Sequence, residues 1–97
     1  MAKHTFIVAY DVCDPKRLRE LAKAMLGFGD RIQFSVFRCL LNERQRELLF
    51  SAVTAIIHHK EDRVVVIDVG PTDGQAEKRF RYFGRSLPPS SDDSMVI

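Results

Sequence analysis

The stretch from Thr5 to Asp11 constrains the fold more than any other part of the chain. Six residues that suit a buried strand lead directly into the carboxylate of Asp11. Asp14 and Pro15 then predict a helix start, because Asp caps helices and Pro needs no N–H donor at the first helical position. Ligands collect at the carboxyl ends of strands in open α/β sheets, so Asp11 is the first candidate functional residue.

Two amphipathic helices follow from the spacing of apolar residues. The first begins at Pro15, and its stripe consists of Leu18, Leu21, Ala22, Met25 and Leu26. Gly27 and Gly29 are expected to end it in the left-handed conformation of a C-cap. The second begins after Asn42, which forms a capping box with Gln45. Its stripe consists of Leu48, Leu49, Ala52, Val53, Ile56 and Ile57.

Three further segments have the composition of strands. Side chains along residues 31–40 alternate between two faces. Ile32, Phe34 and Val36 are expected to pack against the helices. Gln33, Ser35 and Phe37 are expected on a face suited to an interface. A kink near Ser35 would split this run into two strands, and the sequence leaves both options open. Residues 63–69 are mostly β-branched, as expected of a central strand covered on both faces. Residues 79–83 are a fourth candidate strand.

This order of elements predicts an α+β protein with a ferredoxin-like sandwich: two helices on one face of a four- to five-stranded mixed sheet. We expect residues 1–85 to form one domain, residues 86–94 a linker, and residues 95–97 a C-terminal strand that docks on a sheet edge of the same or a partner subunit. The sheet face without helices must be solvated or paired. Phe37, the aromatic residues near position 82 and the apolar tail favour pairing, and therefore a homodimer.

The composition excludes several classes of protein. The 97 residues are 45% hydrophobic with a net charge of +2, and no apolar run approaches a membrane span, so we expect a cytoplasmic protein with no membrane partner. Cys13 and Cys39 have no metal-ligand spacing and are too few for a disulfide framework. His58 and His59 are adjacent and diverge on a helix, which disfavours a metal site there.

Asp11 alone is a weak metal site, because Mg²⁺ is usually held by one or two carboxylates together with waters and substrate phosphates. A two-fold dimer would bring a second Asp11 to the first. The alternative is that Asp11 only closes a turn. Arg17, Arg19 and Arg31 are candidates to grip phosphates around this strand end, although a solvated helix face also explains such residues.

The segment from Lys78 to Arg85 is the strongest sequence signal for nucleic-acid binding. It contains four cations and three aromatic residues without an acidic residue. Cations bind backbone phosphates and aromatic rings stack on bases. The four cations are Lys78, Arg79, Arg81 and Arg85. The alternative for Phe80 and Tyr82 is that they are core residues.

The residues around Asp11 resemble a known family. Tyr10-Asp-Val12, a basic helix start and the run from Gly29 to Cys39 (Gly-Asp-Arg-Ile-Gln-Phe-Ser-Val-Phe-Arg-Cys) are similar to the signature of the Cas-two family of CRISPR-associated proteins. The resemblance spans nearly the whole chain. Phe34 stands where tyrosine is common in the family, and the loop of residues 70–75 has its own composition.

The resemblance implies a homodimer whose sheets face one another and whose C-terminal strand crosses to the partner. It also implies an endonuclease that depends on Mg²⁺ (or Mn²⁺) and acts on single-stranded RNA or double-stranded DNA. Asp11 from each subunit would hold the metal, with Tyr10, Arg17, Arg31, Ser35 and Phe37 as supporting catalytic residues.

Three functional hypotheses remain open at this point. The first is a CRISPR adaptation protein with a metal-dependent nuclease site. The second is a non-catalytic DNA-binding scaffold that bridges dimers of the CRISPR integrase, using Arg19 and the basic segment 78–85. The third is a toxin-like ribonuclease or a small-ligand regulatory domain on the same fold.

Overall fold

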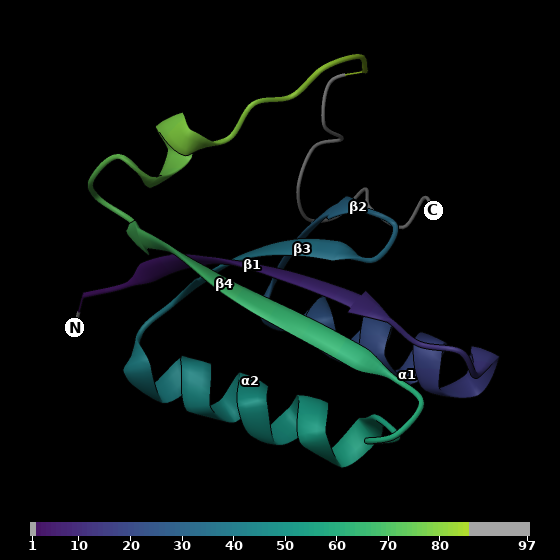
Figure 1. Ribbon diagram of the computed structural model, residues 1–97. Coiled ribbons are helices and arrows are strands. Elements are labelled where there is room, and N and C mark those ends of the chain that lie inside the picture. Colours follow the sequence, from purple (N-terminus) through teal and green to yellow (C-terminus); the bar gives the residue numbers. More distant parts are fainter. Residues whose placement is uncertain (1, 86–97) are drawn as a thin grey trace.

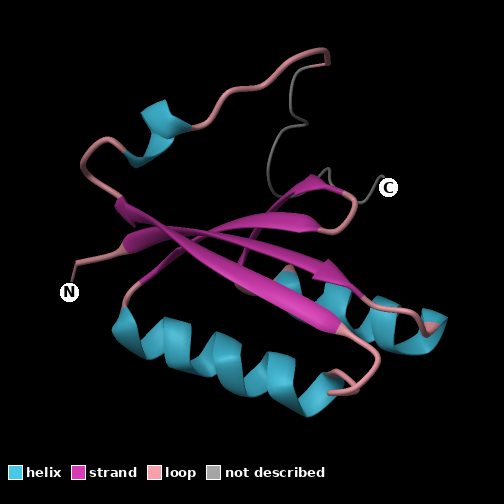
Figure 2. Ribbon diagram, viewed as in Figure 1, coloured by secondary structure: helices cyan, strands magenta, loops and turns pink. Residues whose placement is uncertain are grey.

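Two helices lie on one face of a four-stranded sheet, and a short 3₁₀ turn lies beyond the other face (Figures 1 and 2). The structure is a computed structural model and describes residues 2–85. Its elements are β1 (His4–Asp11), α1 (Pro15–Met25), β2 (Gly29–Gln33), β3 (Val36–Leu41), α2 (Glu43–Ile56), β4 (Arg63–Pro71) and η1 (Ala76–Arg79). The predicted two-layer α+β arrangement is confirmed.

The described sheet is antiparallel throughout, with the strand order β2-β3-β1-β4. The expectation of a mixed sheet was therefore wrong. The connections β1–α1–β2 and β3–α2–β4 each skip one position in the sheet, and an antiparallel strand occupies that position. β1 is consequently central: it pairs with β3 on one side and with β4 on the other.

The core lies between the sheet and the helices. β1 contributes Phe6, Val8 and Tyr10, which are all less than one-tenth exposed. The residues that complete the buried cluster are Val12, Leu21, Met25, Phe37, Cys39, Leu41, Leu49 and Val53. Both predicted helices and their N-caps are confirmed: Asp14 accepts a hydrogen bond from the Arg17 amide, and Asn42 and Gln45 form the reciprocal capping box. Two residues of the predicted apolar stripes are exposed: Leu26 is 54% and Leu48 is 52% exposed.

Residues 29–41 form a hairpin of two strands, which settles the open alternative at Ser35 in favour of a split. The chain turns at Phe34 and Ser35. A register shift after Arg31 places Gln33 opposite Val36. Phe37 is fully buried in the core, and Ile32 and Val36 line the helix-free face. The predicted assignment of faces was wrong: Ile32 and Val36 share a face as expected, but it is the helix-free face, and Phe37 lies on the face packed against the helices.

β4 is an edge strand within the described sheet and is not covered on both faces as expected. Val64 and Val66 pack against the core, whereas Val65 is 44% and Ile67 is 49% exposed. The apolar run of residues 64–67 is continuous because Val64 and Val66 face the helices, whereas Val65 and Ile67 form an apolar surface on the helix-free face.

Residues 79–83 do not form the predicted strand. Ala76–Arg79 is a 3₁₀ turn, and the chain from Phe80 continues without strand pairing. Side-chain contacts hold this segment over the sheet rather than beside its edge. Arg38 of β3 pairs with Glu77 at 3.0 Å, and the Arg79 guanidinium donates a hydrogen bond to the Val69 carbonyl.

The predicted linker 86–94 and C-terminal strand 95–97 lie outside the described residues. Within residues 2–85, neither helix has the length and apolarity needed to cross a membrane.

Gly29 is required by close packing and not by a left-handed C-cap. Neither it nor Gly27 has a positive φ, and α1 ends on Leu26 in the right-handed region. A Cβ at Gly29 would collide with the Arg38 carbonyl oxygen and would lie 2.7 Å from Sγ of Cys39. Glycine thus allows β2 to approach β3 at the start of the hairpin.

We predict that Gly29→Ala lowers the free energy of unfolding by about 1–3 kcal/mol, because the added methyl group overpacks the β2–β3 pair. Urea denaturation measures this change. Gly27→Ala is the matched control, since its Cβ would meet its nearest neighbour, the Ala24 carbonyl oxygen, at 3.4 Å. Equal stability of the two variants would contradict the packing argument.

Candidate functional site

Asp11 ends β1 with an exposed side chain on the helix-free face of the sheet. Strand alternation directs Tyr10 into the core and places Asp11 on the same side as Ile7 and Ala9. Arg63, the first residue of β4, is its direct cross-strand partner. Residues in such a pair lie on one face of the sheet with Cβ atoms roughly 4.5–5.5 Å apart. A carboxylate and a guanidinium therefore share this end of the sheet.

The tip of the β2–β3 hairpin lies beside Asp11. The backbone N–H of Tyr10 donates to the carbonyl oxygen of Ser35 at 3.1 Å, which fixes the tip to the end of β1. The Tyr10 ring stacks on Phe37, with centroids 6.2 Å apart. The Arg31 guanidinium lies over Phe37 as well, 5.4 Å from its centroid. The structure thus brings together four residues that the sequence singled out around Asp11.

Two polar atoms in this cluster are buried without a hydrogen-bond partner among the described residues: Oη of Tyr10 and Nε of Arg31. Burial raises the pKa of Tyr10, and the positive charge of Arg31 opposes part of that increase. Tyr10 is therefore a neutral phenol at physiological pH. Its ring stacks on Phe37 beside the hairpin tip.

Arg17 is part of an ion-pair cluster. Its Nε donates to Asp62 at 2.8 Å, and its Nη2 donates to Glu61 at 3.2 Å. The side chain of Asp62 has no exposed surface, and hydrogen bonding to it raises the pKa of Arg17. Arg17 thus binds two carboxylates of the α2–β4 loop, where the sequence led us to expect a grip on phosphates. Arg19, two residues further along α1, is exposed to solvent.

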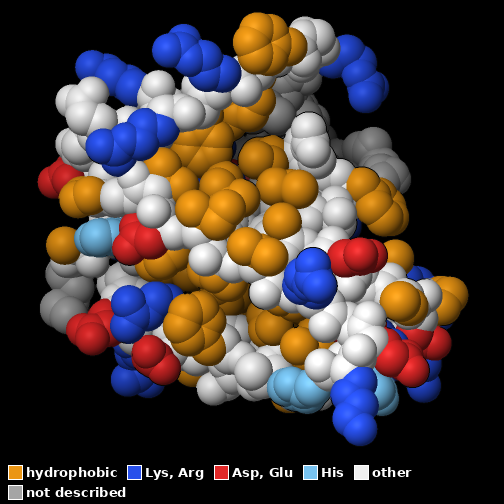
Figure 3. All heavy atoms as spheres, in the orientation of Figure 1, with side chains coloured by type: hydrophobic (Ala, Val, Ile, Leu, Met, Phe, Trp, Pro, Cys, Tyr) orange, Lys and Arg blue, Asp and Glu red, His pale blue; other side chains and the backbone are white. Residues whose placement is uncertain are grey.

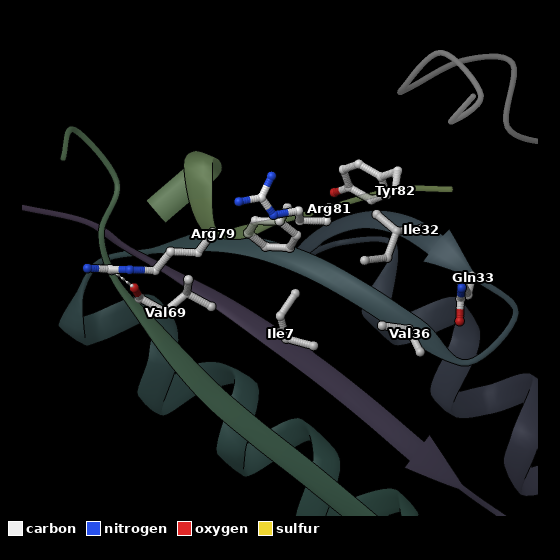
Figure 4. A pocket seen from close by; sticks show the side chains of 9 residues that line it. Ile7, Ile32, Gln33, Val36, Val69, Arg79, Arg81 and Tyr82 are labelled. Carbon is white, nitrogen blue, oxygen red and sulfur yellow. Dashed lines mark hydrogen bonds between the residues drawn. The ribbon is translucent and has the colours of Figure 1, made fainter. Parts of the chain in front are cut away.

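The basic segment begins at the far end of β4 and returns over the helix-free face. A hollow between this segment and the sheet is lined by Ile7, Ile32, Gln33, Val36, Val69 and residues 79–82 (Figure 4). The Arg79 guanidinium donates a hydrogen bond to the Val69 carbonyl. Lys78, Arg81 and Arg85 are exposed. Hydrophobic side chains gather over the middle of the molecule, and Lys and Arg side chains border them near the top of the view (Figure 3).

Arg63 was missed by sequence reasoning. Its place at the start of a β-branched run identified it only as the beginning of a strand. The signal that would have found it is the antiparallel register of β1 and β4, which places Arg63 opposite Asp11.

Within residues 2–85, no group of three or more His, Cys, Asp or Glu side chains is placed to hold a metal ion. At the end of β1, Asp11 contributes a single exposed carboxylate.

The fold and site together define a class of protein: a ferredoxin-like sandwich with a solvent-facing carboxylate at the end of its central strand, flanked by a hairpin tip and an arginine. The family model described as CRISPR associated protein Cas2 matches residues 4–83. The chain therefore belongs to the Cas2 family, which is the Cas-two family indicated by the sequence motif.

Individual relatives agree with this assignment. The chain is 40% identical over 96 residues to the CRISPR-associated endoribonuclease Cas2 1 of Rhodospirillum rubrum, covering 99% of this chain and 93% of that protein. It is 32% identical over 95 residues to the CRISPR-associated endoribonuclease Cas2 of Geobacter sulfurreducens, covering 98% and 99%.

Two solved structures share the fold. A hypothetical protein, TT1823, from Thermus thermophilus superposes with a TM-score of 0.74 at 30% identity, covering 91% of this chain and 98% of that one. Streptococcus pyogenes Cas2 at pH 6.5 superposes with a TM-score of 0.72 at 30% identity, covering 82% and 99%.

The Arg17–Asp62 ion pair makes stability depend on pH. The hydrogen bond from Arg17 is the main cause that lowers the pKa of Asp62 to about 2. An unfolded Asp has a pKa of about 3.9, so the folded state favours the ionised carboxylate. This contribution to stability is fully present above the unfolded pKa and is lost as the pH falls through the folded pKa.

We therefore predict that wild type and Asp62→Asn differ most in their urea midpoints at pH 6, and that the difference shrinks as the pH is lowered towards 2. Urea titrations at several pH values measure it. A difference that stays constant across this range would contradict the ionic origin of the contribution.

Proposed function

We propose that this Cas2-family protein is a metal-dependent endonuclease that hydrolyses phosphodiester bonds of RNA or double-stranded DNA, and that it acts in the adaptation stage of CRISPR defence. The observation that carries the proposal is the exposed carboxylate of Asp11 at the carboxyl end of β1, beside Arg63 and the hairpin tip. The names of the relatives, endoribonuclease and endonuclease, support hydrolysis of nucleic acid.

The donor at Asp11 fits Mg²⁺ or Mn²⁺, because a carboxylate oxygen is a hard ligand and Mg²⁺ retains several waters beside one or two carboxylates. Asp11 would hold the ion, which when bound supplies an activated water and charge stabilisation at the scissile phosphate. The other roles belong to the chain's own side chains. Arg63 and Arg19 would bind phosphate oxygens, and Tyr10, Arg31, Ser35 and Phe37 hold the hairpin tip in place beside Asp11.

A homodimer formed through the helix-free face would supply the second carboxylate. Val65 and Ile67 expose large apolar side chains on this face, and Asp11 lies on the same side of β1. Burial of such a surface against a second copy is favourable by roughly 25 cal/mol per Å² of apolar area. The negative charges of two Asp11 side chains would repel one another unless a cation lies between them, which supports a shared metal site.

A second candidate function is a DNA-binding scaffold that joins dimers of the CRISPR integrase without cutting. The exposed Lys78, Arg81 and Arg85, together with Phe83, which is 91% exposed, favour it. These side chains suit binding of phosphates and bases and include no group for hydrolysis.

We predict that Asp11→Asn reduces Mg²⁺-dependent cleavage of single-stranded RNA and double-stranded DNA by at least about 100-fold, because it removes the charged metal ligand while preserving shape. Gel assays of purified protein with and without EDTA measure this loss. Asp73→Asn, a change in the exposed loop after β4, is the matched control and should cleave like wild type.

Full cleavage by Asp11→Asn would overturn the enzymatic function. Spacer acquisition that survives Asp11→Asn and is lost with Arg81→Ala would instead support the scaffold.

We also predict that Ile67→Asp converts the dimer to a monomer, because it places a charge among the exposed apolar side chains of β4 on the helix-free face. Size-exclusion chromatography with light scattering measures the mass. Leu48→Asp is the control: Leu48 is 52% exposed, as Ile67 is 49% exposed, but it lies on α2 in the opposite layer. A dimer that persists in Ile67→Asp, or that Leu48→Asp disrupts equally, would contradict dimerisation through this face.

A further inference from the structure

Asp62 is the most heavily bonded carboxylate in the described part of the chain. Arg17 donates to it from Nε at 2.8 Å and from Nη2 at 3.2 Å. The backbone N–H groups of His58 and Cys13 donate to it at 2.8 Å and 3.3 Å. Its side chain has no exposed surface. A buried carboxylate with four donors is held in one orientation, because loss of any donor leaves its charge less compensated.

These donors come from three separate parts of the chain. Cys13 lies in the loop that follows β1, and Arg17 in the first turn of α1. His58 follows α2, and Asp62 itself precedes Arg63, the residue opposite Asp11. Glu61 adds two contacts, from Arg17 Nη2 and from the Cys13 thiol, which donates to the Glu61 carbonyl at 3.5 Å. The cluster thus binds the loop after Asp11 to the loop before Arg63.

We propose that Asp62 is a positioning residue for the Asp11 site: together with Arg17 it sets the separation and orientation of Asp11 and Arg63. The proposal rests on the proposed nuclease function for its effect on catalysis, and on the hydrogen bonds alone for its effect on the loop. It gives Arg17 a role that acts through Asp62, in place of direct contact with substrate.

The expected effect is on turnover rather than on substrate binding. Without the Asp62 carboxylate, the loop of residues 12–14 has fewer fixed contacts and Asp11 samples more orientations. Misplacement of a reacting group by about 1 Å costs up to about 100-fold in rate. The cations that would bind phosphate remain, and pairing of β1 with β4 keeps the backbone of Arg63 in place, so KM should change much less than kcat.

The experiment compares Asp62→Asn with Asp68→Asn. Asp68 is a matched control because it is an aspartate of β4 that also accepts hydrogen bonds, from His4 Nδ1 at 2.9 Å and from the Gly70 N–H at 2.9 Å, whereas Asp62 lies just before β4. Asp68 lies about 17 Å further along the strand from Arg63, away from Asp11. Both variants are assayed for cleavage with Mg²⁺ at a temperature well below their unfolding midpoints.

A second readout is independent of cleavage. Cys13 is exposed and Cys39 is fully buried, with burial as the main cause that raises the pKa of Cys39 to about 11. The rate of modification by a thiol reagent at pH 7.5 therefore reports on Cys13 in the folded protein. We expect Asp62→Asn to lower kcat about 10-fold or more with KM within about 2-fold, and to speed labelling of Cys13 at least about 3-fold. Asp68→Asn should change neither.

Normal kcat and normal Cys13 labelling in folded Asp62→Asn would overturn the proposal, and so would equal effects in Asp68→Asn. If Asp62→Asn does not fold, Arg17→Gln removes the same ion pair from the other side and carries the same expectations. If Asp11→Asn cleaves normally, the nuclease function fails, while Cys13 labelling still decides whether Asp62 fixes the loop.

Discussion

The alternation of side chains along β1 is the constraint on which the rest of the structure depends. β1 is bonded on both sides, so its pleat decides what each face of the sheet presents. Phe6, Val8 and Tyr10 face the helices, and burial of each such side chain contributes roughly 1.5–3 kcal/mol. A slip of one residue would expose these three side chains and turn Asp11 towards the core as an uncompensated charge. The packing of the core thus determines the direction of the candidate catalytic side chain.

The end of β1 is held from two sides by segments that are distant in the sequence. On one side, Ser35 at the hairpin tip accepts the N–H of Tyr10. On the other, Asp62 binds Cys13 and Arg17. Strand ends otherwise fray, because their last backbone groups lack partners. These two attachments restrain the surroundings of Asp11, and a functional site needs such supporting contacts if its geometry is to be reproducible.

The helix-free face has the opposite character from the helix-covered one. It carries exposed Val65 and Ile67 on the edge strand β4, and Arg38 of β3 is bound there to Glu77 and to Asp30. The segment from η1 to Tyr82 covers part of this face through polar side-chain contacts and not through strand pairing. An apolar sheet face with a polar border is the pattern expected of an interface in an oligomer.

The sequence by itself determined the local elements: β1 up to Asp11, both helices with their Asp14 and Asn42 caps, and the family motif around Tyr10 and Arg31. These depend on neighbours within a few residues, where periodicity and capping chemistry suffice. Only the tertiary structure decided that β4 is an edge strand, that Phe37 is core, and that residues 79–83 lie across the sheet. It also decided that Arg17 binds Asp62 and that Arg63 faces Asp11. Each of these depends on strand order, register or a contact between distant segments, and no local pattern carries that information because packing of the whole chain selects among the alternatives.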